Sequence, residues 1–160
     1  MRKTLVLMAG LLSMMNATLA FAAAPAAAAG PNPKLTPKQV VQLQLDALKA
    51  VDAPVKDAGF ATVFRFASPE NQGQTGPLPR FAKMIREGFG EMLNHKSSRL
   101  LAPLQQQDQL LQPVELVSLA GRTYRYVFLL RRVDSENCAG CWMTDGVIPQ
   151  DDAAPQSQEL

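Results

Sequence analysis

The chain has 160 residues, of which 19% are charged, and its formal net charge is +2. This size and balance exclude a polybasic nucleic-acid binder, a disulfide-rich miniprotein, a disordered chain and a polytopic membrane protein. The apolar residues concentrate at the N-terminus, where they occupy 21 of the first 30 positions. Arg2 and Lys3 supply the positive balance, because the rest of the chain has 14 basic and 14 acidic side chains.

The first 22 residues have the pattern of a secretory signal peptide. Arg2 and Lys3 precede an apolar stretch over 5–12, and Ala20 and Ala22 form a small-x-small cleavage site. An uncleaved anchor is the alternative, since residues 4–24 are long enough to span a bilayer, but no Lys or Arg follows directly to stop transfer. We expect cleavage, no stable membrane anchor, and export to the periplasm or medium. The Ala/Pro-rich residues 23–35 then predict a linker.

Three helices are predicted next in the chain. Thr36, Pro37 and Gln39 form a capping-box start, and apolar residues at helical spacing extend the first helix over 37–51. A second helix is predicted over 57–67, where the residue before Pro69 ends it. Residues 71–76 are polar and contain glycine, so they predict a loop. A third helix begins at 77–79 and ends near 88–90.

After the third helix the apolar period changes from helical to alternating. We predict strands over 97–104, 113–119, 123–132 and 141–148, with a turn over 133–140. Asp145-Gly146 predicts a turn or bulge. Helices that precede an antiparallel meander make an α+β fold with N-terminal helices packed on the sheet. The single domain therefore covers 36–149, and the acidic residues 150–160 are predicted to be a flexible tail.

Cys138 and Cys141 are the first candidate for chemistry. A structural metal needs about four ligands, and the sequence offers two cysteines and one distant histidine, so we predict no metal site. A disulfide remains, either structural or redox-active. Redox pairs usually sit at a helix N-terminus, whereas this pair precedes Trp142 in a predicted strand. The structural reading is therefore favoured, with thiol-disulfide oxidoreductase activity as the alternative.

His95 is the only histidine of the chain. It is a candidate polar site residue because a histidine can act as an acid, a base or a pH switch near neutrality. A structural role at the C-terminal end of the third helix is the favoured alternative. No motif places a carboxylate beside it, and no complete catalytic set is recognised.

The strand over 123–132 carries its aromatic residues on one face. Tyr124, Tyr126, Phe128 and Leu130 alternate with the opposite set. If the helices cover this face incompletely, its residues form the wall of a ligand pocket. The candidate pocket residues are Phe64, Phe81, Met84, Tyr124, Tyr126, Phe128 and Trp142.

Several stretches together resemble the family called domain of unknown function 4864. They are Phe66-Ala67-Ser68-Pro69-Glu70-Asn71, the helix start Gly76-Pro77, His95-Lys96-Ser97, Phe128-Leu129-Leu130-Arg131-Arg132, and Cys141-Trp142-Met143-Thr144-Asp145-Gly146-Val147. The resemblance covers residues 36–149. That family is similar in layout to the nuclear-transport-factor-like, or cystatin-like, superfamily, which implies a curved antiparallel sheet wrapped against helices into a cone with a pocket. It implies no reaction and no catalytic residue.

The function expected from these features is non-enzymatic binding of a small molecule or a protein partner in a pocket between sheet and helices. A cone-fold enzyme that acts on a small organic substrate is an alternative, and so is the oxidoreductase. We predict no cofactor and no nucleic-acid partner, and pairing into a homodimer is left open.

Overall fold

The computed structural model describes residues 30–135 and 138–150. Its helices are α1 (Pro37–Lys49), α2 (Ala58–Phe66), α3 (Pro69–Thr75) and α4 (Leu78–Gly88), followed by the 3-10 turn η1 (Gly90–Met92). Its strands are β1 (Ser97–Leu100), β2 (Leu104–Gln106), β3 (Gln109–Val117), β4 (Thr123–Ser135) and β5 (Cys138–Gln150). The predicted α+β class, with helices before an antiparallel sheet, is confirmed. The predicted signal peptide, linker residues 23–29 and tail residues 151–160 lie outside the described residues.

The capping signal read from the sequence places the start of α1. The Thr36 side chain accepts a hydrogen bond from the backbone N–H of Gln39, and the Gln39 side chain accepts one from the N–H of Thr36. These two bonds satisfy backbone donors that the first turn of a helix leaves free. The helix ends at Lys49, two residues before the predicted boundary.

Residues 71–76 were predicted to be a loop, and this is wrong, because α3 covers most of them. Ser68 caps α3 by accepting from the N–H of Asn71, and Pro69 occupies the first helical position. The Gln72 side chain donates to the carbonyl oxygens of Phe64 and Ala67, at 2.9 Å each. The polar side chains that argued for a loop therefore tie the helix to its neighbours.

The strand predicted over 97–104 is divided into β1 and β2, which lie end to end along β3. Pro113 explains the break. Its carbonyl oxygen accepts from the N–H of Leu101, so its nitrogen, which carries no hydrogen, faces the same segment between the two strands. The sheet cannot pair continuously there, and β3 nevertheless begins four residues earlier than the predicted strand.

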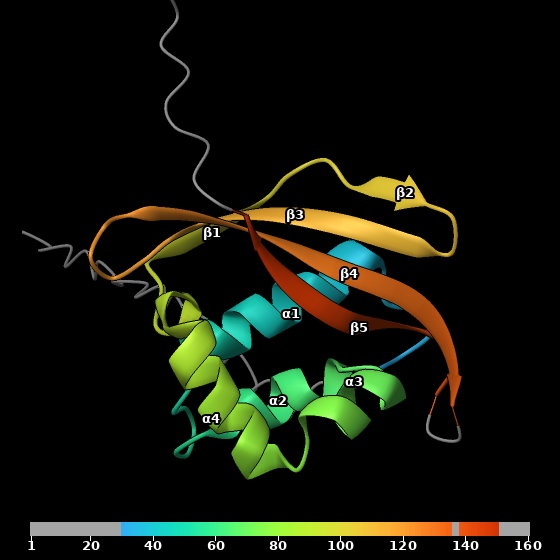
Figure 1. Ribbon diagram of the computed structural model, residues 1–160, viewed down its shortest axis with the longest axis horizontal. Helices are drawn as coiled ribbons and strands as arrows, with labels where there is room; N and C mark the ends of the chain where they lie inside the picture. The colour runs from blue at the N-terminus through green and yellow to red at the C-terminus, as the bar shows by residue number, and fades with distance from the viewer. Residues whose placement is uncertain (1–29, 136–137, 151–160) are drawn as a thin grey trace, which may run out of the picture.

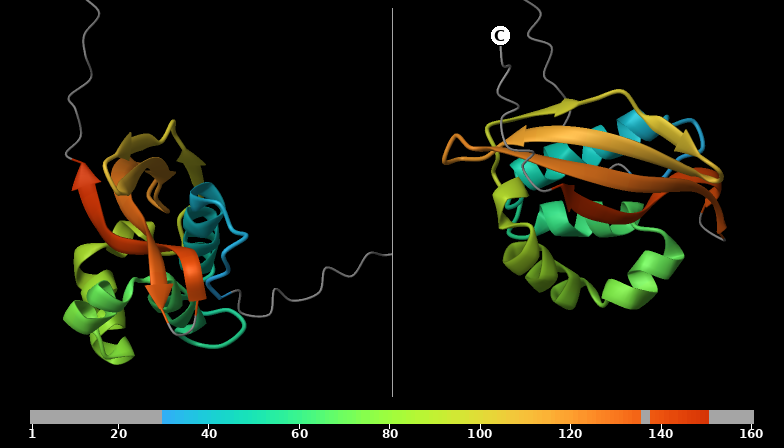
Figure 2. Two further views of the ribbon diagram at one scale, coloured as in Figure 1. Left: turned by 90° about the vertical axis from the view of Figure 1, so that its right-hand side faces the viewer. Right: turned by 45° about the horizontal axis from the view of Figure 1, so that its top comes forward.

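The predicted turn over 133–140 is also wrong in extent, because β4 and β5 continue as a long hairpin that reaches Ser135 and Cys138. The strand order is β1-β3-β4-β5, all antiparallel, with β2 beside β3. The sheet is curled, as the left view of Figure 2 shows. At its far end the β4–β5 hairpin bends toward α3 (Figure 1). An isolated bridge between Ala67 and Thr144 joins the middle of β5 to the end of α2.

All four helices pack on one face of the sheet (Figure 1). The predicted alternation along β4 is confirmed, because Tyr126, Phe128 and Leu130 are buried and the intervening residues are more exposed. Helix α2 crosses α1 at Gly59, where an added Cβ would lie 2.3 Å from the carbonyl oxygen of Ala47. Only glycine allows that approach. The core thus lies between the helices and the inner face of the sheet.

Candidate functional site

A cavity of about 260 Å³ opens between the helices and the middle of β4 and β5. Its apolar wall comes from the helices and from β4 and β5: Leu48, Val63, Ala67, Phe81, Met84, Ile85, Phe89, Met92, Phe128 and Val147. Its polar residues come from α3 and β5 alone: Asn71, Gln74, Thr75, Thr144 and Asp145, beside Gly146. The cavity therefore has an apolar body and one polar end.

Helix α4 supplies the outer part of the apolar wall. Its apolar residues recur at helical spacing, so Phe81 and Ile85 are buried and Met84 is half-buried beside them. The ring of Phe81 packs against the ring of Phe64, with centroids 5.1 Å apart. Such tilted aromatic pairs add to the energy of area burial. The wall is thus built on two helices that pack directly on one another.

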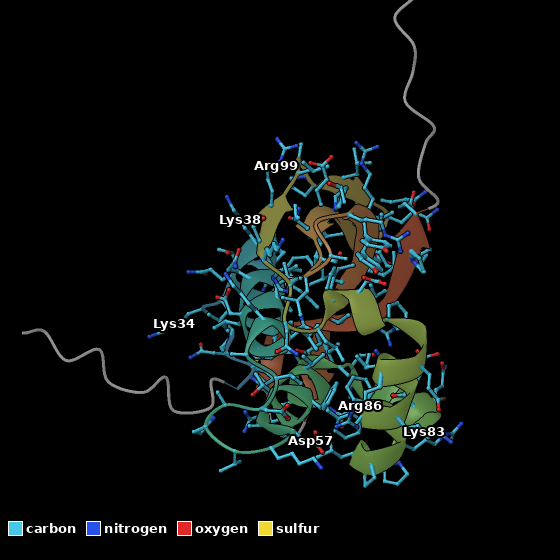
Figure 3. The ribbon with its side chains drawn as sticks, turned by 90° about the vertical axis from the view of Figure 1, so that its left-hand side faces the viewer. Lys34, Lys38, Asp57, Lys83, Arg86 and Arg99 are labelled. Atoms are coloured by element: carbon cyan, nitrogen blue, oxygen red, sulfur yellow. A yellow bond between two sulfur atoms is a disulfide. The ribbon has the colours of Figure 1, made fainter. Side chains whose placement is uncertain are left out.

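An ion pair holds these two helices together from the solvent side. Arg86 of α4 pairs with Asp57 at the start of α2, and the two side chains point toward one another in Figure 3. The Arg86 guanidinium also lies over the ring of Phe60, 4.5 Å from its centroid. The contacts of Arg86 with Asp57 and Phe60 therefore join α4 to α2, and none of these three residues lines the cavity.

Helix α3 holds the polar end against the edge of the sheet. The carbonyl oxygen of Thr144 accepts from the N–H of Ser68 at 2.9 Å and from Asn71 Nδ2 at 3.1 Å. The hydroxyl of Thr75 donates to the carbonyl oxygen of Asn71 at 2.7 Å. Helix α3 has no buried residue of its own. Hydrogen bonds therefore position this helix where apolar packing is missing.

Asp145 occupies a β-bulge, as the sequence predicted for Asp145-Gly146. Thr144 pairs with Leu130 and Gly146 with Leu129, so Asp145 has no partner on β4. Its Oδ1 lies 2.9 Å from Nε of Arg131, and Nη2 of the same arginine lies 2.8 Å from Oε2 of Glu70. The bulge thus places one carboxylate at the polar end and ties it to α3 through a shared arginine.

A buried polar contact joins the back of the cavity to α1. Gln44 is 1% exposed, and its Nε2 donates to Oγ1 of Thr144 at 2.9 Å. The Thr144 hydroxyl lies 3.2 Å from Gln44 Oε1 and can donate to it. Buried polar groups are costly unless they are paired. This pair satisfies both side chains and fixes β5 relative to α1.

The seven predicted pocket residues lie in different places. Phe81, Met84 and Phe128 line the cavity. Phe64 stands behind Phe81. The three others lie elsewhere along the sheet: Tyr126 packs its ring 6.2 Å from that of Phe89, Tyr124 contacts Arg122, and Trp142 lies under the guanidinium of Arg132.

His95 is 2% exposed and does not line the cavity. Its Nδ1 donates to the carbonyl oxygen of Met92 at 2.8 Å, since a carbonyl can only accept. Its Nε2 is buried without a hydrogen-bond partner. Burial lowers the pKa of His95, although the bond to Met92 opposes this effect.

Cys138 and Cys141 lie at the start of β5, with their Cα atoms 5.8 Å apart, a distance that a disulfide spans. Gly140 between them has a φ of 72°, a conformation that favours glycine, at the register shift between Val133 and Ser135 of β4. Cys141 is fully buried. Neither cysteine lies at a helix N-terminus, where a dipole lowers a thiol pKa.

The opposite face of the sheet carries a second groove, of about 410 Å³. It is lined by Leu101, Leu104, Leu111, Pro113, Val114, Arg125, Tyr126, Val127, Ile148 and Gln150. Leu104 and Ile148 are 63% and 46% exposed. A homodimer that uses this face stays a prediction.

Within residues 30–135 and 138–150, no group of three or more His, Cys, Asp or Glu side chains lies close enough to hold a metal ion. In the same residues, no helix has both the length and the apolar composition needed to cross a membrane.

Sequence reasoning missed the polar end of the cavity, including Asn71, Thr75 and Asp145. A usable signal existed for the first two. Ser68-Pro69 repeats the Thr36-Pro37 start of α1, and a helix begun there puts Asn71 and Thr75 on one face, four residues apart. For Asp145 the sequence indicated the bulge and not its neighbours, because Arg131 and Glu70 are distant in the chain.

No curated protein and no solved structure shows significant similarity to the chain. The link to the nuclear-transport-factor-like superfamily therefore stays a prediction. The sequence profile of one family matches residues 32–157, which include every helix and strand of the fold. The chain belongs to this family, described as Domain of unknown function (DUF4864).

Proposed function

We propose that this protein binds a small, mainly apolar ligand in the cavity between its helices and the middle of strands β4 and β5. The cavity itself carries the proposal. Its wall combines aromatic and methionine side chains with a few polar groups at one end, which is the usual composition of a ligand pocket. Met84 and Met92 are flexible and polarizable, so they adapt to the shape of an apolar guest.

The size of the cavity sets the scale of the ligand. A dry protein cavity of about 150 Å³ holds benzene, and this one measures about 260 Å³. It therefore suits an apolar body somewhat larger than one aromatic ring. Binding of this kind needs no catalytic group, and the residues that form the wall act by shape and by exclusion of water.

Filling the cavity tests the proposal. Met84→Trp places a larger side chain in the wall, and Lys83→Trp introduces the same side chain one residue earlier on the exposed side of α4. With n-octanol as the probe, isothermal titration calorimetry should show saturable binding to the natural chain and to Lys83→Trp. We expect at least a tenfold weaker affinity for Met84→Trp. Equal affinity for both variants, or no binding to the natural chain, would overturn the proposal.

We further propose that the protein works outside the cytoplasm after removal of residues 1–22, with Cys138 and Cys141 joined. The charged start and small-residue exit support export, and the 5.8 Å separation of the Cα atoms supports the bond. We include in this proposal a cone-like, cystatin-like arrangement of the curled sheet against the helices. Intact mass spectrometry of the exported chain, unfolded without reductant so that the buried Cys141 is accessible, should show loss of the leader and no thiol that iodoacetamide can alkylate. A full-length mass, or two alkylated cysteines, contradicts this part.

A further inference from the structure

We propose that the cavity selects ligands whose polar end is a hydrogen-bond donor, above all a primary amine, over ligands that carry a carboxylate. The inference rests on the proposed function and names the chemical class of its ligand. It comes from the polar end of the cavity, where α3 and β5 meet.

The donors at this end are mostly used within the protein. Thr75 has a single hydroxyl hydrogen, which goes to the carbonyl oxygen of Asn71 and, more weakly, toward Asn71 Oδ1 at 3.3 Å. Asn71 Nδ2 donates to Thr144, and Gln74 Nε2 lies 3.4 Å from Glu70 Oε1. The Thr144 hydroxyl is held by Gln44. The hydroxyl hydrogens of Thr75 and Thr144 are thus engaged, and a ligand that can only accept finds at most the second N–H of the Asn71 and Gln74 amides.

The acceptors, in contrast, stay available. The bond from Nδ2 to a carbonyl fixes the orientation of the Asn71 amide, so its oxygen is an acceptor by necessity. Thr75 Oγ1 keeps its lone pairs once its hydrogen is engaged. Oδ1 of Asp145 is buried against Arg131 Nε, 2.9 Å away, and Oδ2 accepts from Gln109 Nε2 at 3.3 Å but keeps a further lone pair. A donor brought into this end of the cavity therefore finds acceptor lone pairs on Asn71 Oδ1, Thr75 Oγ1 and Asp145 Oδ2.

The charges favour the same class of ligand. Glu70 and Asp145 share one guanidinium, that of Arg131, which leaves this group of three with a net negative charge. In a partly buried site, an ammonium group gains a charge-assisted hydrogen bond to such a carboxylate. A carboxylate ligand would instead meet a like charge and few donors. The apolar wall then holds the body of the amine.

The test compares three probes with the same tail: n-octylamine, n-octanol and octanoate. Titration calorimetry of the full natural chain at pH 7 and physiological salt should give the tightest binding for n-octylamine, with octanoate about tenfold weaker or more. Octanoate that binds as tightly as n-octylamine overturns the amine preference and leaves the proposed function standing. If none of the three binds, both the preference and the proposed function are wrong.

Two variants test whether Asp145 and Thr75 cause the preference for an amine over a carboxylate. Asp145→Asn keeps the shape and removes the charge, and Thr75→Val removes an acceptor with little change of volume. Both should reduce the affinity ratio of n-octylamine to octanoate several-fold while n-octanol binding changes less. Asp108→Asn is the matched control, since Asp108 is exposed in the turn between β2 and β3. Thr75→Val keeps the Asp145 ion pair, so it still tests the inference if Asp145→Asn fails to fold. An unchanged ratio in Thr75→Val and in folded Asp145→Asn overturns it.

Discussion

The two ends of the helical layer meet the same sheet in different ways. Helix α1 buries Val40, Val41, Gln44, Leu45 and Leu48 over 13 residues. Helix α3 has seven residues and buries none of them. The first contact is apolar and close-packed, whereas the second consists of hydrogen bonds and the ion pair between Glu70 and Arg131.

This difference shows how the cavity arises in a small domain. Along most of α1, buried apolar side chains pack closely against the sheet, and of its buried residues only Leu48 lines the cavity. Where the short polar helix α3 is held at the sheet edge by directional bonds, its polar side chains line the space behind it and do not fill it. The α1 contact should therefore supply stability, and the α3 contact should supply binding.

Truncation of one side chain in the α1 core and one in the cavity wall on α4 should separate stability from binding most clearly. Leu45→Ala removes a fully buried side chain of α1 and should cost about 2–5 kcal/mol of unfolding free energy. Met84→Ala only enlarges an existing cavity, so it should cost less than about 2 kcal/mol. Chemical denaturation measures both. If Met84→Ala is as destabilising as Leu45→Ala, the assignment of stability to the α1 side is wrong.

A smaller loss of unfolding free energy is expected when the contact between Gln44 of α1 and Thr144 of β5 is removed. Gln44→Leu leaves the buried Thr144 hydroxyl without partners and should cost about 1–3 kcal/mol. The double variant Gln44→Leu/Thr144→Val should recover part of that loss, because both polar groups are then gone. Gln42→Leu is the control, since its bond to Asp46 is exposed and worth only a few tenths of a kcal/mol. Additive losses in the double variant would show that the two side chains are not coupled.

The smallest expected effect concerns pH. Burial, the largest cause, lowers the pKa of His95 below its ordinary value of 6.5; Lys49 adds to this, and the Met92 bond and Asp46 oppose it. Below pH 6.5 the unfolded chain then binds more protons than the folded one, so stability falls as pH decreases from 6.5 toward the folded pKa. Denaturation midpoints between pH 7.5 and 5 should drop more for the natural chain than for His95→Asn. If the denaturation midpoints of the two proteins fall equally over this pH range, His95 is not the source of the pH dependence.

Sequence reasoning predicted α1 and the face of β4 because both depend on local signals. Thr36 and Pro37 indicate a helix start, and the alternation along β4 separates buried from exposed residues. The same kind of signal at Ser68-Pro69 predicts the end of α2. It marks the start of α3 as well, and the polar sequence that follows concealed this.

The division of β1 from β2 was not predictable in the same way. Pro103 within residues 97–104 is a local signal against an unbroken strand, but the break depends as well on Pro113 of the neighbouring strand. A proline has no backbone N–H, so the segment that lies opposite it loses a ladder hydrogen bond. That segment is known only when the register of the sheet is known.

The sequence by itself determined the α+β class, the helix start at Thr36, the aromatic face of β4 and the bulge at Asp145, because spacing and turn chemistry act over a few residues. Only the tertiary structure decided that Asn71, Thr75, Asp145 and Phe128 line one cavity. It also decided which of their hydrogen-bonding groups are engaged. Such choices depend on contacts between residues about 60 to 100 positions apart, as Glu70 with Arg131 and Gln44 with Thr144 show.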